Sequence, residues 1–184
     1  MDIGAGILIA LWCADHVGLP LTVLSIFLGI GAALFPDLDV LSAVLPRGSL
    51  LRRIIGEHRG LLHRPFVYVL LSPLAFALFG KALGLLFTLG VAYHLIHDTF
   101  FLGYGVKWFW PFSYKSLSLF HDKGGLITSD ILLWGPEDDA KIEAAYRTED
   151  WIRTFYLRPG VIAFTEYPTL IVALVLLYAR FSGQ

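Results

Sequence analysis

Apolar residues along the chain gather into five stretches, which cover residues 3–14, 21–35, 66–79, 82–103 and 161–181. Only the last two reach the roughly 20 residues that a simple membrane-spanning helix needs. Gly18 and Pro20 separate the first two stretches, and Gly80 and Lys81 separate the third from the fourth, so each pair predicts a helical hairpin. The pattern therefore predicts an all-α, polytopic membrane helical bundle of about five apolar helices. The shorter helices would be only about 18 to 24 Å long, which leaves open whether they cross the whole bilayer.

Composition agrees with a membrane protein and excludes other classes. Hydrophobic residues make up 57% of the 184 residues, charged residues make up 16%, and the mean hydropathy is +0.69. The net charge of -1 provides no basic surface for nucleic acid, so we expect no nucleic-acid partner. Cys13 is the single cysteine, which excludes both an internal disulfide and a cysteine zinc site. Any metal must therefore be held by His and carboxylate side chains.

The distribution of basic residues predicts the side of the membrane that each loop faces. If both hairpins form, the N-terminus and residues 36–65 and 104–159 all lie on one side. These segments contain 12 of the 14 Lys and Arg residues, whereas Lys81 and Arg180 fall on the other side. Such an excess marks the cytoplasmic side. We therefore expect a multi-pass protein of the inner (cytoplasmic) membrane.

The chain is predicted to form one integral membrane domain over residues 1–184. Its core covers residues 1–115, a cytoplasmic or interfacial insertion covers 116–158, and a C-terminal transmembrane helix covers 159–184. Residues 108–120 are rich in aromatic side chains and predict a segment at the membrane interface. Residues 137–151 are strongly polar and follow Pro136, which predicts a short cytoplasmic helix.

Side chains of the metal-ligand type stand at the ends of these apolar stretches. His94 and Asp98 are four residues apart and share one face of a helix, which His97 would also reach. Asp37 and Asp39 follow Pro36; in an extended stretch they point to opposite sides, so one would ligate an ion while the other orients a ligand or binds a second ion. Taken alone, the first pair is equally consistent with a hydrogen bond inside a bundle, and the second with a polar turn.

A further pair of imidazoles lies between these two groups. His58 and His63 bracket Gly60, which permits a turn that would bring both rings inward. Arg59 and Arg64 carry planar positive charge that suits phosphate, although both also fit the excess of basic residues on this side. Imidazoles and carboxylates in about equal number are what a Zn²⁺ or Mn²⁺ site of one or two ions needs. Hydrolysis by metal-activated water is the natural reaction class.

At these residues the chain resembles a family of inner-membrane metal-dependent hydrolases of the LexA-binding type. Four motifs carry the resemblance within about residues 1–115: FPDLD, EHRGLLH, HLIHD and the G-x-x-x-x-W-P-F-S that starts at Gly105. Family members usually read P-D-x-D, H-R-x-x-T-H-S and S-H-x-x-x-D, so this chain departs from them at Leu62, Arg64 and Tyr93. The set of His and Asp residues is more loosely similar to those of zinc-dependent phospholipase C and P1-type nucleases.

The resemblance implies a metal site and an activity. The implied metal ligands are Asp37, Asp39, His58, His63, His94 and Asp98, with Asp2 as a further ligand where family members carry a Thr-His pair. Arg59 and Arg64 would bind phosphate, and Asp39, His97 and Arg59 are the expected catalytic residues, the first two as general acid or base. The expected reaction is hydrolysis of a phosphoester in a membrane lipid or lipid-linked substrate, at the cytoplasmic face.

A non-catalytic protein is the alternative. It would be a transporter of metal ions or protons, or a scaffold that recruits a partner through its acidic helix. A transporter usually has ionisable residues around a midplane site in repeated halves, whereas here they gather at one face without a repeat. The sequence assigns no role to Glu166, His121, Asp122 or Asp130, and it specifies neither the exact substrate nor the oligomeric state.

Overall fold

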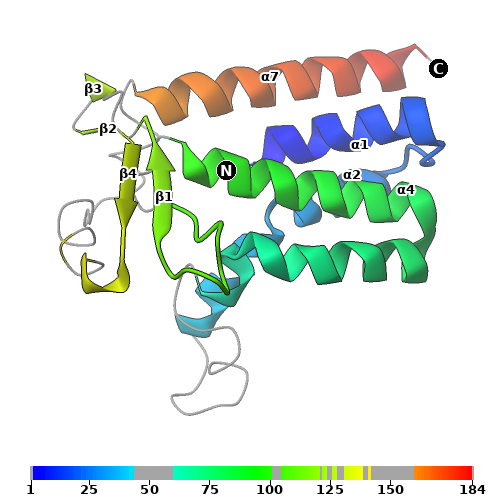
Figure 1. The fold of residues 1–184 in the computed structure, drawn as a ribbon. Coiled ribbons are helices and arrows are strands. Elements are labelled where there is room, and N and C mark those ends of the chain that lie inside the picture. Colours follow the sequence, from blue (N-terminus) through cyan, green and yellow to red (C-terminus); the bar gives the residue numbers. More distant parts are fainter. Residues whose placement is uncertain are drawn as a thin grey trace.

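The computed structural model describes residues 2–43, 60–100, 105–120, 122–123, 126–127, 131–138, 141 and 160–183. The described residues contain four α-helices: α1 (Ile3–Val17), α2 (Val23–Ala33), α4 (Pro65–Thr99) and α7 (Val161–Ser182). Two short 3-10 helices, η1 (Phe35–Ala43) and η2 (Leu61–His63), precede α4, and a third, η3, covers Pro136–Asp138. The helices lie side by side, and α1 contacts α2, α4 and α7 (Figure 1).

The first hairpin forms as the sequence predicts. Gly18 ends α1 in the left-handed conformation, with φ of 74°, which glycine adopts without steric cost. Thr22 then caps α2: its Oγ1 accepts a hydrogen bond from the Ser25 N–H at 3.1 Å, and its own N–H donates to Ser25 Oγ at 2.8 Å. This reciprocal cap satisfies donors that the first helical turn leaves without partners.

The third and fourth apolar stretches form a single element, α4, that folds back on itself. Gly80 is its one non-helical residue, with φ of 79° and ψ of 179°. The rings of Tyr68 and Phe87 are 6.2 Å apart, whereas 19 residues of straight helix would separate them by about 28 Å. The turn predicted at Gly80 is therefore confirmed. The predicted count of five apolar helices is not confirmed. The two arms meet at one residue and form one element, so the described part of the chain has four α-helices.

The prediction of an all-α fold is wrong after α4, where the chain forms short β-ribbons. Strand β1 (Ser116–Leu119) pairs antiparallel with β4 (Ile131–Trp134), with Ser116 opposite Trp134, and β2 (Asp122–Lys123) pairs with β3 (Leu126–Ile127). The sequence Ser-Leu-Ser-Leu of β1 alternates with a period of two, as a strand does, and both of its serines are buried. The segment predicted to lie flat at the interface thus continues into a strand. Most of the predicted helix 137–151 lies outside the described residues.

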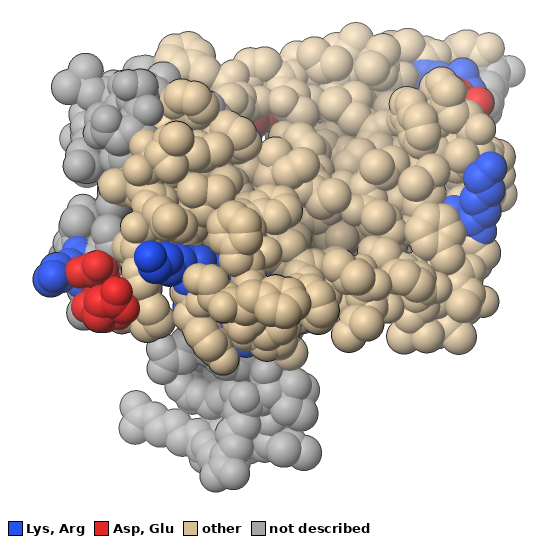
Figure 2. Space-filling model, viewed as in Figure 1, with Lys and Arg blue, Asp and Glu red and all other residues tan. Residues whose placement is uncertain are grey.

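The described surface has the character of a membrane protein. By length and composition, two elements are candidate membrane spans: Pro65–Thr99, which turns back at Gly80, and Ala163–Ser182. Figure 2 shows a broad band of uncharged side chains across this face, with charged groups toward its two ends. At one end Arg180 Nη2 of α7 lies 2.5 Å from Asp15 Oδ1 of α1. The charge-free middle is the part of the surface that hydrocarbon would cover.

Small residues allow the helices to approach closely, as is common in membranes. A Cβ added at Gly6 of α1 would lie 2.6 Å from the Gly29 carbonyl oxygen of α2. A Cβ at Gly29 would in turn lie 3.0 Å from Ala10 Cβ and closer still to the Gly6 oxygen. The backbones of α1 and α2 therefore touch at this pair of glycines.

This contact predicts opposite effects of one substitution at two neighbouring glycines. Gly29→Ala forces α1 and α2 apart, and we expect it to lower the free energy of unfolding by about 1 to 3 kcal/mol, as overpacking does. Gly31→Ala places its methyl group where nothing lies within 4 Å, so it should be neutral or stabilising by up to about 1 kcal/mol. Thermal unfolding of both variants in the same detergent measures the difference. Equal melting temperatures would contradict the close contact.

Candidate metal centre

One end of the bundle gathers most of the ligand-type residues that the sequence singled out. Five elements meet there: the start of α1, η1, η2, the last turns of α4, and the adjacent β-ribbon (Figure 1). Asp2 immediately precedes α1, and His94 and Asp98 lie near the end of α4. Asp37 and Asp39 lie in η1, and His63 ends η2. Residues from four separate elements thus reach one place.

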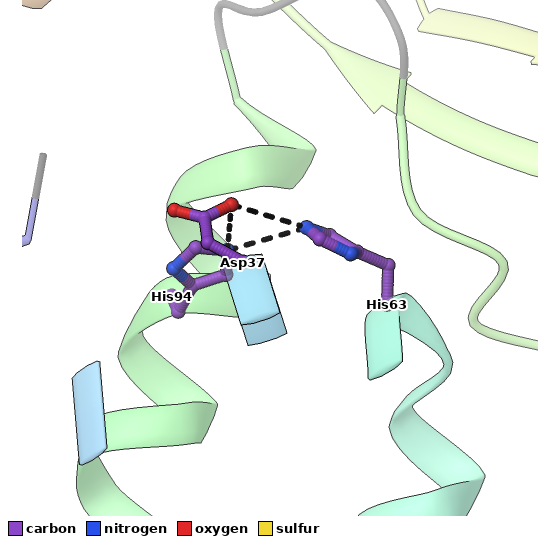
Figure 3. Close-up of side chains that lie close together, drawn as sticks. All are labelled: Asp37, His63 and His94. Carbon is purple, nitrogen blue, oxygen red and sulfur yellow. Dashed lines mark hydrogen bonds and ion pairs between the residues drawn. The ribbon is translucent and has the colours of Figure 1, made fainter. Parts of the chain in front are cut away.

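Four atoms converge at the centre of this group, and we call them the four-atom cluster: His63 Nε2, His94 Nε2, Asp37 Oδ1 and Asp98 Oδ2. The two imidazole nitrogens lie 3.4 Å apart. Asp37 Oδ1 lies 3.7 Å from His63 Nε2 and 3.6 Å from His94 Nε2. Asp98 Oδ2 lies 3.4 Å and 3.8 Å from the same two nitrogens. Figure 3 shows Asp37, His63 and His94 pointing toward one another from η1, η2 and α4.

These distances suit a metal site. Asp37, His63 and His94 each offer one ligand atom, and these atoms lie within 4.8 Å of one another; Asp98 Oδ2 adds a fourth, 3.4 Å and 3.8 Å from the two imidazole nitrogens. Ligand atoms bound to one Zn²⁺ at about 2.0 to 2.2 Å lie about 3.3 to 3.6 Å apart at tetrahedral angles, close to the separations between the imidazole nitrogens and the carboxylate oxygens here. Two neutral imidazoles and two carboxylates also match the donor preferences of Zn²⁺ and Mn²⁺. Both the chemistry and the spacing of the cluster are therefore suited to a divalent ion.

Each of the two imidazoles has a further buried carboxylate behind it. His63 Nδ1 donates to Asp39 Oδ2 at 2.8 Å, and the same oxygen accepts from the Gly60 N–H at 2.9 Å. His94 Nδ1 lies 2.5 Å from Asp2 Oδ2 in a buried ion pair. A carboxylate on Nδ1 fixes the tautomer and orients Nε2 toward a metal, which is the usual arrangement around histidine ligands. Both Nε2 atoms point into the cluster.

The charges in this buried group need positive compensation. Burial alone would lower the pKa of His63, but its contacts with Asp37, Asp39 and Asp98 outweigh burial and raise that pKa to about 10. Burial would likewise raise the pKa of Asp2, but its contacts with His94 and His97 outweigh burial and lower that pKa to about 2. Asp2 thus stays ionised, and His63 keeps its proton. A divalent cation would take over that compensation and release the protons.

The four-atom cluster opens on the side of Asp37. The side chain of Asp37 is 41% exposed, whereas those of His63, His94 and Asp98 are buried. Arg64, next to His63, holds its guanidinium 4.7 Å from the centre of the Trp110 ring, a cation–π contact that fixes its position. A substrate would therefore reach the cluster past Asp37.

Not all of the predicted metal ligands lie in the four-atom cluster. Asp39 and Asp2 lie behind the imidazoles rather than in the four-atom cluster. His97 Nδ1 lies 3.1 Å from the second oxygen of Asp2, and its ring stacks on Tyr93 with centroids 5.9 Å apart. His58 and Arg59 lie outside the described residues, so their predicted roles stay predictions. His121 and Asp130, to which the sequence assigns no role, also lie outside them.

Asp2, the carboxylate behind His94, belongs to a second group of ligand-type atoms. Asp2, His97 and Glu166 each offer one ligand atom, and these atoms lie within 4.8 Å of one another. Glu166 belongs to α7, so this group connects the C-terminal helix to the start of α1 and the end of α4. The sequence alone assigned no role to Glu166, because a separation of 69 residues from His97 reveals nothing about contact.

Two supporting contacts were not predicted. Trp108 Nε1 donates to Thr99 Oγ1 at 2.7 Å, and the Thr99 hydroxyl donates to the Leu95 carbonyl at 2.7 Å, which fixes the end of α4 against the following loop. Tyr68 OH donates to the Leu62 carbonyl at 2.7 Å and holds η2 against α4. A buried Thr close to a Trp in sequence is the signal that would have indicated the first contact.

Removal of the charge behind His94 tests the carboxylate–imidazole arrangement. We expect Asp2→Asn to weaken zinc binding by about 10- to 100-fold, as loss of such supporting carboxylates does, while the four-atom cluster stays in place. Asp15→Asn is the matched control, since Asp15 lies at the opposite end of α1 in an ion pair with Arg180. Competition with a chromophoric chelator measures both affinities. Equal zinc affinity in the wild type and Asp2→Asn would show that Asp2 does not support His94.

Comparison with known proteins yields one match. A family model described as YdjM inner membrane protein matches residues 2–181. No curated protein and no solved structure matches the chain.

Proposed function

The chain belongs to the YdjM inner membrane protein family, and from this premise we propose that it is a membrane-embedded, metal-dependent hydrolase that cleaves phosphoesters of membrane lipids or lipid-linked substrates. One observation carries the proposal: two imidazole nitrogens and two carboxylate oxygens converge, and each imidazole has a buried carboxylate behind it. Purely structural pairs of His and Asp do not require ligand atoms from three elements to converge in this way.

A bound divalent ion would lower the pKa of water to about 7 and polarise a phosphoryl oxygen. The protein residues do the remaining work. Asp39 and Asp2 hold the imidazoles of His63 and His94 in the orientation that the ion needs. Asp37, as the most exposed member of the four-atom cluster, faces the side from which substrate and water arrive. Arg64 contributes a fixed positive charge that suits a phosphate group.

The place of the cluster in the fold favours hydrolysis over transport. It lies where four elements meet at one end of the bundle, beside the β-ribbon, rather than halfway along the helices (Figure 1). A transporter binds its ion near the middle of the membrane, where two gates can alternate around it. A site at the end of the bundle instead meets lipid headgroups. By the excess of basic residues, that end faces the cytoplasm in our proposal.

A panel of phosphoesters with and without metal tests the proposal. The purified protein in detergent should release product from phosphomonoester and phosphodiester lipids when Zn²⁺ or Mn²⁺ is supplied, and a chelator should stop the reaction. The same protein in sealed vesicles should give no zinc flux. Metal binding without turnover on any member of the panel, together with zinc flux into vesicles, would overturn the hydrolase proposal in favour of a carrier.

A further inference from the structure

A groove of about 700 Å³ lies along the outside of the bundle, between α2, η1 and α4. Its lining is almost entirely apolar, and it is open along one side. Small residues form the floor, where Ala32 and Ala75 are buried, and large exposed side chains such as Phe27, Leu74 and Leu78 form the walls. The groove exists because the small side chains at its floor leave space between the large side chains on either side.

The groove leads to the four-atom cluster. Phe35 and Leu38 of η1 line its end, and they flank Asp37, the exposed member of the cluster. The first arm of α4 forms one wall, and that arm begins directly after His63 and Arg64. A molecule that fills the groove therefore has one end beside the segment of η1 that carries Asp37.

The groove is large enough for a hydrocarbon chain. At about 30 Å³ for each methylene group, a chain of about 16 carbons takes about 480 Å³, which is less than the volume of the groove. Phe27 and Leu38, which both line the groove, are 11 positions apart along α2 and η1, which corresponds to about 17 Å of helix, a little more than half of a hydrocarbon core about 30 Å thick. The groove thus accommodates a chain that enters from one leaflet.

We propose that this groove binds a single hydrocarbon chain of an anionic phosphoester lipid and places its phosphate at the four-atom cluster. The apolar walls select the chain, Arg64 complements the negative head, and Asp37 lies at the junction between them. This inference rests on the proposed function for its reaction, but the binding of the chain is independent of turnover. It makes the substrate class a lipid with at least one long chain rather than a water-soluble phosphoester.

Gly31 provides a substitution that blocks the groove without disturbing the packing. It lines the groove, is exposed, and has nothing within 4 Å of an added Cβ. Gly31→Trp would fill the space that the chain needs. Val69→Trp is the matched control, because Val69 is exposed on α4 and lies roughly opposite Leu71 and Leu74 at 100° per residue.

Binding is measured first, with a lysophosphatidic acid that carries a photoreactive diazirine in its chain. In detergent micelles, we expect crosslinks in α2 and the first arm of α4 within the groove, strongly reduced in Gly31→Trp and unchanged in Val69→Trp. Crosslinks spread evenly over the outer faces of the helices, or unaffected by Gly31→Trp, would overturn the groove proposal.

Turnover is measured separately, with hexadecyl and methyl 4-nitrophenyl phosphate, from which water releases 4-nitrophenol and leaves the alkyl phosphate. We expect Gly31→Trp to lower kcat/KM for the long-chain probe by about tenfold or more, since apolar contacts are lost, and to leave the methyl probe unchanged. Equal rates on both probes and in both variants would overturn the groove proposal while supporting the hydrolase. Specific crosslinking with no release from either probe would keep the groove and overturn the hydrolase.

Discussion

His63→Ala and His94→Ala are each expected to abolish metal binding and to reduce hydrolysis by about a thousandfold or more, because the ion contributes several kcal/mol to the transition state and each 1.36 kcal/mol is tenfold in rate. Each imidazole supplies one of four ligand atoms and also neutralises a buried carboxylate behind it. Loss of either ring therefore opens the coordination sphere and leaves Asp39 or Asp2 without that partner. Elemental analysis and initial rates on the phosphoester panel measure both effects.

His16→Ala is the matched control for these variants. His16 is exposed near the end of α1, where its Nδ1 contacts the Trp12 carbonyl at 2.9 Å, and it lies 14 residues from Asp2 along the same helix. It should keep the full metal content and activity. His63→Gln and His94→Gln preserve much of the side-chain volume, so they separate loss of the ligand from loss of folding. Full activity in a folded His94→Gln protein would contradict its place in the cluster.

The second large effect is stabilisation of the protein by metal. Zinc at about 100 times its dissociation constant should stabilise the folded state by about 2.7 kcal/mol, since the ion binds the assembled site and not the unfolded chain. For a chain of 184 residues this corresponds to a rise in melting temperature of about 5 to 11 °C. The rise is expected because the ion joins residues of η1, η2 and α4, which lie far apart in the sequence.

A titration series measures this stabilisation. The melting temperature of detergent-solubilised protein should rise with added Zn²⁺ and fall again with a chelator. The His94→Ala protein should melt at one temperature with and without zinc. If the melting temperature of the wild-type protein did not change over the same range of zinc concentrations, this would contradict a metal site in this part of the chain.

The sequence predicted part of the fold because local rules govern that part. Gly18 and Pro20 have few conformations that continue a helix, and a glycine between two apolar stretches indicates a turn, so both hairpins could be predicted. The number of helices could not be predicted from the sequence, because only Gly80 departs from helical geometry and the two arms of α4 join in one element. The β-ribbons were missed because the aromatic residues of 108–120 suggested an interface, while the period of two in Ser116–Leu119 covers only four residues.

The contacts of the candidate site could be predicted only where the two side chains are close in the sequence. His94 and Asp98 are four residues apart on a helix and do meet, with Nε2 and Oδ2 3.8 Å apart. His63 and Asp39 are 24 residues apart, and His94 is 92 residues from Asp2, so no local rule pairs them. Only the tertiary fold reveals that Asp39 and Asp2 support imidazoles rather than join the four-atom cluster.

The central claim is that His63, His94, Asp37 and Asp98 together hold one divalent ion. X-ray absorption at the zinc edge tests it most directly, on protein loaded with one equivalent of Zn²⁺ and then desalted. The account predicts retained zinc with two imidazole nitrogens and two oxygens at about 2.0 to 2.2 Å. Zinc that is lost on desalting, or a spectrum without imidazole scattering, would contradict it.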